Sequence, residues 1–175
     1  MFKKNILIKG RHADYMKRLV AVIDAVNSVR LFERNLDVYI LAPIVGLAFG
    51  RTSQIDNENK DETSIHTEQL QGEIDVLTYN YRLVMLSAQK ASLSIEERTD
   101  RAYRFDKNEE KRKEGDELFQ SYVLGGIDVL YEKILADTNE LDDYLYNLFE
   151  FFNEYNERYN SVISSTEIID LCKLA

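Results

Sequence analysis

The apolar residues of this chain recur at spacings of three and four over much of its length, which is the period of an α-helix. In the clearest case, residues 64 to 91, the apolar positions follow a 4-3-4-3-4 spacing. We expect helices over residues 12–34, 64–91, 94–105, 118–136 and 138–159, and a further turn or two over residues 164–174. The pattern predicts an all-α fold, an irregular bundle of five to six helices forming a single domain, residues 1–175.

The most apolar stretch runs from Leu36 to Gly50 and contains the chain's one proline, Pro43. Its uninterrupted apolar run is shorter than the ~20 residues that a membrane-spanning helix needs, so we expect a core element and no contact with a membrane. Because Pro43 would break or kink a helix, we favour a kinked, buried helix over a strand. Gly46 and Gly50 are four residues apart and would allow another backbone to come close.

Three segments lack the helical pattern. Residues 1–11 are predicted to form an extended start, and the charged segment 52–63 is predicted to be a surface loop. A second charged segment, residues 106–115, is either a loop or the exposed first turns of the helix that follows it. In that helix, Gly125 and Gly126 each cost roughly 1 kcal/mol relative to alanine, so either the helix kinks there or a neighbour packs tightly against it.

The composition agrees with a folded, helical chain. Apolar residues make up 45% and charged residues 30% of the sequence, and it contains 7 glycines and 1 proline. The single cysteine, Cys172, cannot form an internal disulfide, and the N-terminal residues lack the apolar run of an export signal. We therefore expect a cytoplasmic protein.

Charge is distributed unevenly along the chain. The net charge is −9, but residues 1–51 have a balance of +5 and the remainder has a balance of −14. The basic residues that could contact an anion or a nucleic acid are Lys9, Arg11, Lys17, Arg18, Arg30 and Arg34. Alternatively, the basic third pairs with the acidic helices, within one subunit or between subunits. The converse, acidic helices that mimic DNA, would instead predict a basic protein partner.

Aromatic residues are concentrated in the last long helix, between residues 141 and 159. At 100° per residue, Phe149, Phe151 and Phe152 point in three directions, so one helix face cannot bury them all. Either this helix is central in its own bundle or it forms part of a protein interface, and the two options are compatible. The candidate interface residues are Tyr144, Phe149, Phe151, Tyr155 and Tyr159.

The sequence contains no recognisable catalytic, metal-binding or cofactor-binding motif. The two histidines, His12 and His66, are far apart in sequence, Cys172 has no histidine near it, and no phosphate-binding glycine loop is present. The chain is therefore expected to be a non-enzymatic helical subunit or adaptor, acting in a homo-oligomer or with a protein partner. The alternative is an accessory component of a bacterial DNA-transacting or phage-defence system that contacts nucleic acid through the basic third. A catalytic site assembled from scattered residues stays open at this point.

Overall fold

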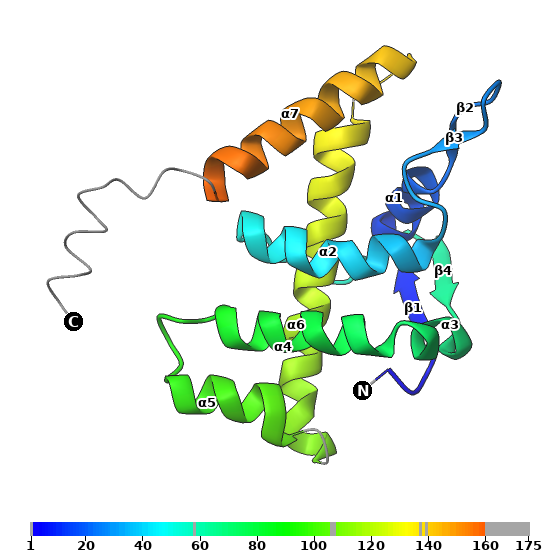
Figure 1. Cartoon of the computed structure of the whole chain (residues 1–175). Helices are drawn as coiled ribbons and strands as arrows, with labels where there is room; N and C mark the ends of the chain where they lie inside the picture. The colour runs from blue at the N-terminus through cyan, green and yellow to red at the C-terminus, as the bar shows by residue number, and fades with distance from the viewer. Residues whose placement is uncertain (1, 58, 106–107, 137, 139, 160–175) are drawn as a thin grey trace, which may run out of the picture.

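The computed structural model describes residues 2–57, 59–105, 108–136, 138 and 140–159, and it is mostly helical (Figure 1). The helices are α1 (Arg11–Leu19), α2 (Asn35–Phe49), α3 (Thr67–Gly72), α4 (Ile74–Ser87), α5 (Ile95–Thr99), α6 (Glu109–Leu130) and α7 (Leu141–Tyr159). Two π-helical segments, η1 (Asp100–Arg104) and η3 (Tyr131–Leu135), continue α5 and α6. Four short strands form two antiparallel pairs: β1 (Ile6–Lys9) with β4 (Glu62–Ile65), and β2 (Val22–Asp24) with β3 (Val29–Arg30). The chain is thus mostly helical, as predicted, but it includes two small sheets that an all-α class leaves out.

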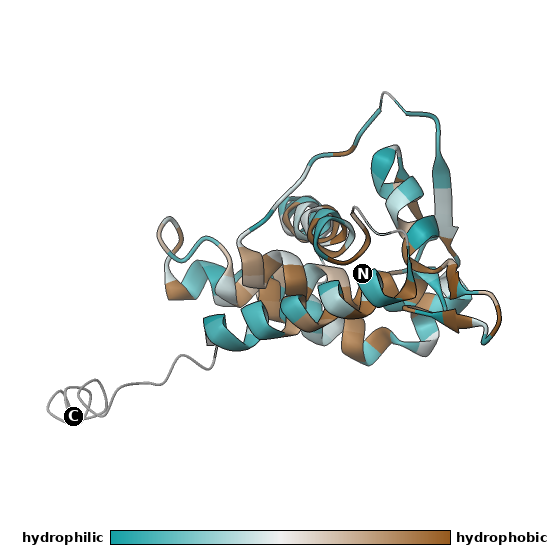
Figure 2. Ribbon diagram, turned by 90° about the horizontal axis from the view of Figure 1, so that it is seen from above, coloured by the Kyte–Doolittle hydropathy of each residue, from teal (hydrophilic) through white to brown (hydrophobic). Residues whose placement is uncertain are grey.

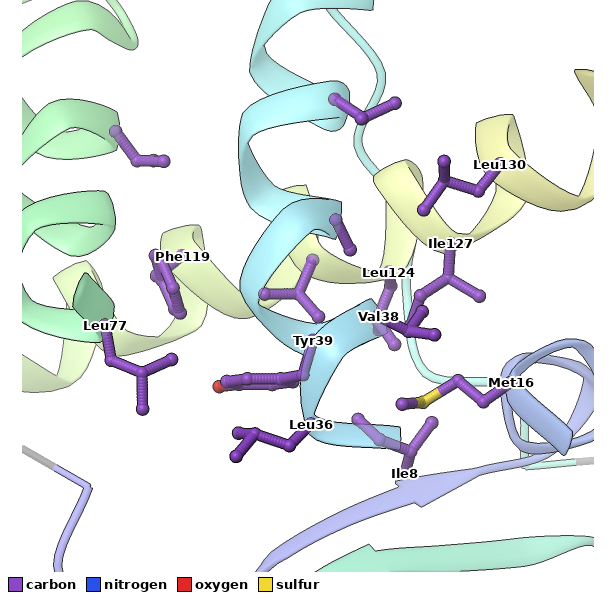
Figure 3. Packing of buried hydrophobic residues seen from close by; sticks show 14 of the residues in the cluster. Ile8, Met16, Leu36, Val38, Tyr39, Leu77, Phe119, Leu124, Ile127 and Leu130 are labelled. Atoms are coloured by element: carbon purple, nitrogen blue, oxygen red, sulfur yellow. The ribbon is translucent and has the colours of Figure 1, made fainter. Parts of the chain in front are cut away.

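The hydrophobic core is built around α6, which α2 crosses near its middle (Figure 1). Figure 3 shows how side chains from β1, α1, α4 and α6 pack around α2. Tyr39 of α2, Leu77 of α4 and Ile127 of α6 are each at most 1% exposed. The apolar segments gather where the helices meet, whereas the outer turns are mainly hydrophilic (Figure 2).

The apolar segment 36–50 is helical, as predicted, and α2 continues through Pro43 without a break. Its end is formed by Gly50, whose φ of 63° is the left-handed conformation that glycine adopts at low cost. Among the described helices, none is both long enough and apolar enough to cross a membrane.

Close packing is confirmed at Gly46, Gly125 and Gly126, where α2 crosses α6. It is wrong at Gly50, where a methyl group would meet nothing within 4 Å. A methyl group on Gly126 would collide with the backbone of Ala42, and one on Gly46 would collide with the carbonyl oxygen of Tyr122. Gly125 lies against the backbone of the segment that follows α2. The two helices therefore approach so closely that their backbones touch, and the glycines are the reason that they can.

The helix expected over residues 12–34 is wrong beyond Leu19, because a β-hairpin follows it. The carboxylate of Asp24 accepts hydrogen bonds from the backbone N–H groups of Val26 and Asn27, at 2.8 and 3.3 Å. Ser28 then adopts a positive φ of 55°, which an α-helix does not allow. This local turn outcompetes the helical periodicity, and the hairpin projects away from the helices (Figures 1 and 2).

The helix expected over residues 64–91 is also corrected. Residues 64 and 65 belong to strand β4, which also takes up the last two residues of the predicted loop 52–63. This strand pairs with the predicted extended start, for example at Ile6 opposite Ile65. The helical region then divides into α3 and α4 at Glu73, whose φ of −116° is outside the helical range. The residue before it is Gly72, and glycine is a poor helix former.

The second charged segment contributes the first turns of α6. The side chain of Asn108 accepts a hydrogen bond from the Lys111 N–H at 3.1 Å and so caps a helix that begins at Glu109. The capping box at the start of α5 is confirmed, since the Ser94 N–H donates to Glu97 at 2.8 Å and the Glu97 N–H donates back at 3.2 Å. The predicted turn over residues 164–174, with Cys172, lies outside the described residues.

Candidate protein interface

Helix α7 is anchored to the rest of the chain along one side. Phe151 is 6% exposed, and its ring stacks on that of Phe49 at the end of α2 with 5.7 Å between ring centres and 8° between planes. The guanidinium carbon of Arg158 lies 4.4 Å from the centre of the same Phe49 ring. One aromatic side chain and one cation of α7 are therefore committed to packing within the chain.

An ion-pair network adds to this anchor. The carboxylate of Glu154 lies 2.7 Å from Nζ of Lys133 in η3 and 2.8 Å from Nη2 of Arg158. Hydrogen bonds from Lys133 and Arg158 hold the pKa of Glu154 below its usual range, because they favour the charged carboxylate. The Asn147 amide also donates to the Ile134 carbonyl at 3.3 Å, so η3 supports α7 at two positions.

The opposite side of α7 is apolar and exposed. Leu145, Phe149 and Phe152 occupy positions i, i+4 and i+7, which share one helix face, and are 55%, 61% and 60% exposed. We call these three residues the α7 stripe. Tyr146, which is 65% exposed, lies beside it. A contiguous exposed apolar face of this kind marks an interaction site more often than scattered apolar residues do.

The structure separates the five predicted interface residues. Phe149 lies in the stripe, and Tyr155 is at its margin with 37% exposed. Tyr144 is half-buried and faces a groove beside the hairpin, while Phe151 is part of the core. The side chain of Tyr159 lies outside the described residues.

Two residues of the stripe were missing from the candidate set, Leu145 and Phe152. The spacing of Phe149 and Phe152, four and seven positions after Leu145, is visible in the sequence. What the spacing could not show is which of the apolar faces of α7 the rest of the chain covers.

The margin of the α7 stripe is acidic. Asp142 is exposed three residues before Leu145, whereas Glu150 lies on the groove beside Lys133 and Arg158 is directed toward Phe49 on the other side. The stripe therefore joins a large apolar area to negative charge, which favours a partner that joins an apolar groove to basic residues.

A second exposed apolar patch lies on the hairpin β2–β3. Val22, Val26 and Val29 are 42%, 91% and 40% exposed. A groove of about 200 Å³ separates this hairpin from α7, and its walls include Ile23 and Tyr144. The hairpin and the start of α7 thus border the same groove.

Most of the predicted anion-contacting residues are paired with carboxylates of the same chain. The pairs are Lys9–Glu62 at 3.3 Å, Arg11–Asp128 at 3.1 Å, Lys17–Asp61 at 2.9 Å, Arg18–Asp14 at 3.0 Å and Arg34–Asp37 at 2.6 Å. Arg30 is exposed on β3. Five of the six residues are therefore paired within the described part of the chain.

One of these pairs belongs to a buried cluster between α1 and α6. Nε2 of His12 lies 3.2 Å from Oδ1 of Asp128, and the two side chains are 0% and 3% exposed. Arg11 reaches the other carboxylate oxygen and also donates to Oγ of Ser53 at 2.9 Å. Nδ1 of His12 has no hydrogen-bond partner in the part of the chain that the structure describes.

The environment of Asp128 favours its charged form. Burial by itself would raise the pKa of Asp128, but His12, Ser53 and the charge of Arg11 more than offset this, so the pKa lies below its ordinary value. Because the side chains of His12 and Asp128 are buried, we interpret the cluster as a clamp that joins α1, the segment after α2 and α6.

Replacing Phe151 with leucine is expected to loosen α7. The loss of ring stacking on Phe49 should lower the free energy of unfolding by about 1 kcal/mol and speed amide hydrogen exchange along α7. Phe149→Leu is the matched control, because Phe149 is 61% exposed and its replacement should leave exchange unchanged. Equal exchange rates in the two variants would contradict the proposed anchor.

The described residues contain no group of three or more histidine, cysteine, aspartate or glutamate side chains placed to hold a metal ion. Comparison of the chain with protein-family models, with curated proteins and with solved structures finds no match.

Proposed function

We propose that this chain is a helical subunit or adaptor that binds another protein through the α7 stripe. The observation that carries the proposal is the exposure of Leu145, Phe149 and Phe152, each more than half exposed on a helix whose opposite face is packed. Burying one such side chain is worth about 1.5–3 kcal/mol, so three on one face are enough to anchor a specific complex.

The geometry supports a helix-in-groove mode of binding. In that mode the apolar residues at positions i, i+4 and i+7 of one helix enter a groove of the partner. The acidic residue beside the stripe, Asp142, would face a basic residue at the groove's edge. The ion pairs of Glu154 hold α7 in place on the side opposite the stripe. Because the helix is already ordered, binding costs less conformational entropy.

The nucleic-acid alternative has weaker support. Five of the six basic residues proposed for it already have a carboxylate partner within the chain. Binding a phosphate backbone would require these pairs to break, and the overall charge of −9 opposes the approach of a polyanion.

The test is the double variant Leu145→Ser/Phe149→Ser, which removes the centre of the stripe without touching the anchor. We expect it to weaken association, with the partner or with a second copy of the chain, by at least about 100-fold, because two anchoring side chains are lost. Association is measured by sedimentation velocity of the purified chain and by quantitative co-purification from cells that express it at native level.

The control is Tyr79→Ser on α4, because Tyr79 is an exposed aromatic residue, 65% exposed, that lies outside the stripe. It should associate like the unchanged protein. If the double variant and the control associate equally well, the stripe is not the binding surface and the proposal fails.

A further inference from the structure

A cavity of about 460 Å³ lies where the segment before β1 meets α2, α4 and α6, far along the chain from the α7 stripe. Its walls include Lys3 and Lys4 from the first segment, Tyr39 of α2, and Arg112 and Asp116 of α6. The volume falls within the range of small-molecule sites, about 300–1,000 Å³. Four elements thus contribute to one concave surface.

The segment that carries the two lysines is held in place on both sides. The Phe2 ring packs edge-on against Phe119 of α6 with 6.0 Å between ring centres, and the Gln71 amide donates to the Phe2 carbonyl at 2.9 Å. On the other side, Oδ1 of Asn5 accepts hydrogen bonds from the N–H and the hydroxyl of Thr67, both at 2.9 Å. The lysines are therefore presented from an anchored stretch of backbone.

The charge of the cavity is opposite to that of the chain as a whole. Nε of Arg112 lies 3.1 Å from Asp116, which balances one positive charge. Lys3 and Lys4 are exposed and, within the described residues, neither forms an ion pair. Two positive charges are thus left over at the edge of this cavity, in a chain whose net charge is −9. A concave surface of one sign concentrates counter-ions of the other sign.

The largely buried side chain of Tyr39 lies in the wall of the same cavity. Tyr39 is 1% exposed, and no other described residue accepts or donates a hydrogen bond to its hydroxyl. Burial, together with the charge of nearby Asp116, raises the pKa of Tyr39, so that it stays a neutral O–H donor. Figure 3 shows the Tyr39 ring between α2 and α4, with its hydroxyl directed away from α2.

We propose that this cavity binds a small organic anion, whose carboxylate or phosphate group accepts a hydrogen bond from Tyr39 and pairs with Lys3 and Lys4. The apolar part of the ligand packs against Phe2 and Phe119, which line the same cavity. The site does not depend on the α7 stripe, and either can exist without the other.

The test uses three probes that share one ring and differ in the attached group: phenyl phosphate, benzoate and benzyl alcohol. Isothermal titration calorimetry of the full chain should show saturable binding at one site for at least one of the anions, and binding of the neutral alcohol at least about tenfold weaker. The stronger of the two anions identifies the ligand as a phosphate ester or as a carboxylate. Saturation by neither anion, or equal binding of the alcohol, overturns the proposal.

Two variants locate the binding. Tyr39→Phe removes only the hydroxyl. We expect it to weaken binding of the anion by about tenfold without loss of fold, since the hydroxyl has no partner among the described residues. Lys3→Gln/Lys4→Gln should weaken it at least as much. Lys60→Gln/Lys90→Gln removes the same charge from exposed positions elsewhere and should have no effect. If this control weakens binding as much as the Lys3/Lys4 variant, the affinity for the anion depends only on the overall charge of the protein, and the proposed site is wrong.

Discussion

Replacing Gly126 with alanine is expected to lower the free energy of unfolding by about 2–3 kcal/mol. In an isolated helix the same change would stabilise by up to about 1 kcal/mol, because alanine is the better helix former. In this fold the new methyl group would collide with the backbone of Ala42, a neighbour that cannot rotate out of the way. The steric cost therefore exceeds the gain in helix propensity, and α2 must move away from α6.

The measurement is urea-induced unfolding followed by circular dichroism. Gly72→Ala is the matched control, since a methyl group there meets no atom within 4 Å. It should leave stability unchanged or raise it slightly. A Gly126→Ala variant as stable as the Gly72→Ala variant would show that the two helices are not in backbone contact at this crossing.

Replacing Asp128 with alanine is expected to lower the free energy of unfolding by about 3 kcal/mol. The carboxylate is 3% exposed and neutralises Arg11 while facing the buried ring of His12. Removing one partner of a buried ion pair leaves the other without compensation, which is why such changes cost about 3–5 kcal/mol. We take the lower end because Arg11 is half-exposed and can regain water.

The control for this prediction is Asp61→Ala, which breaks the exposed pair between Lys17 and Asp61. An exposed pair contributes at most about 1 kcal/mol, so the effect should be small. If the two substitutions have equal effects, the cluster around Asp128 is not the clamp that we infer.

The same cluster predicts a pH dependence. The pKa of Asp128 is lowered in the folded chain, so its contribution to stability is complete above the ordinary aspartate pKa and is lost as the pH falls through the lowered value. Unfolding measured between neutral pH and pH 3 should therefore show a decline at acidic pH that is smaller in Asp128→Ala. An unchanged decline would assign the acid sensitivity to other carboxylates.

The two faces of α7 have different consequences for any experiment on this protein. Phe151 and Phe149 are two residues apart, but the first is part of the core and the second is exposed. A loss of binding in a Phe151 variant would therefore report a displaced helix, whereas a loss in a Phe149 variant reports the contact itself.

Much of the helical content follows from local sequence. The 3.6-residue period, the capping box at Ser94 and the scarcity of glycine and proline each act within a few neighbouring residues, and they predicted α2, α4, α5, α6 and α7. The same local reasoning missed the turn at Asp24, because the carboxylate's bonds to the next residues compete with the helix at a position where periodicity continues.

Other features were decided only by the tertiary structure. The exposed face of α7 depends on Phe49, about a hundred residues earlier, and the pairing of β4 with β1 depends on residues more than fifty positions apart. The contact between Arg11 and Asp128 spans 117 positions. The sequence by itself determined that this is a helical chain with a basic first third and an aromatic last helix. Which charges cancel and which apolar face stays uncovered depended on contacts between distant segments, which no local pattern encodes.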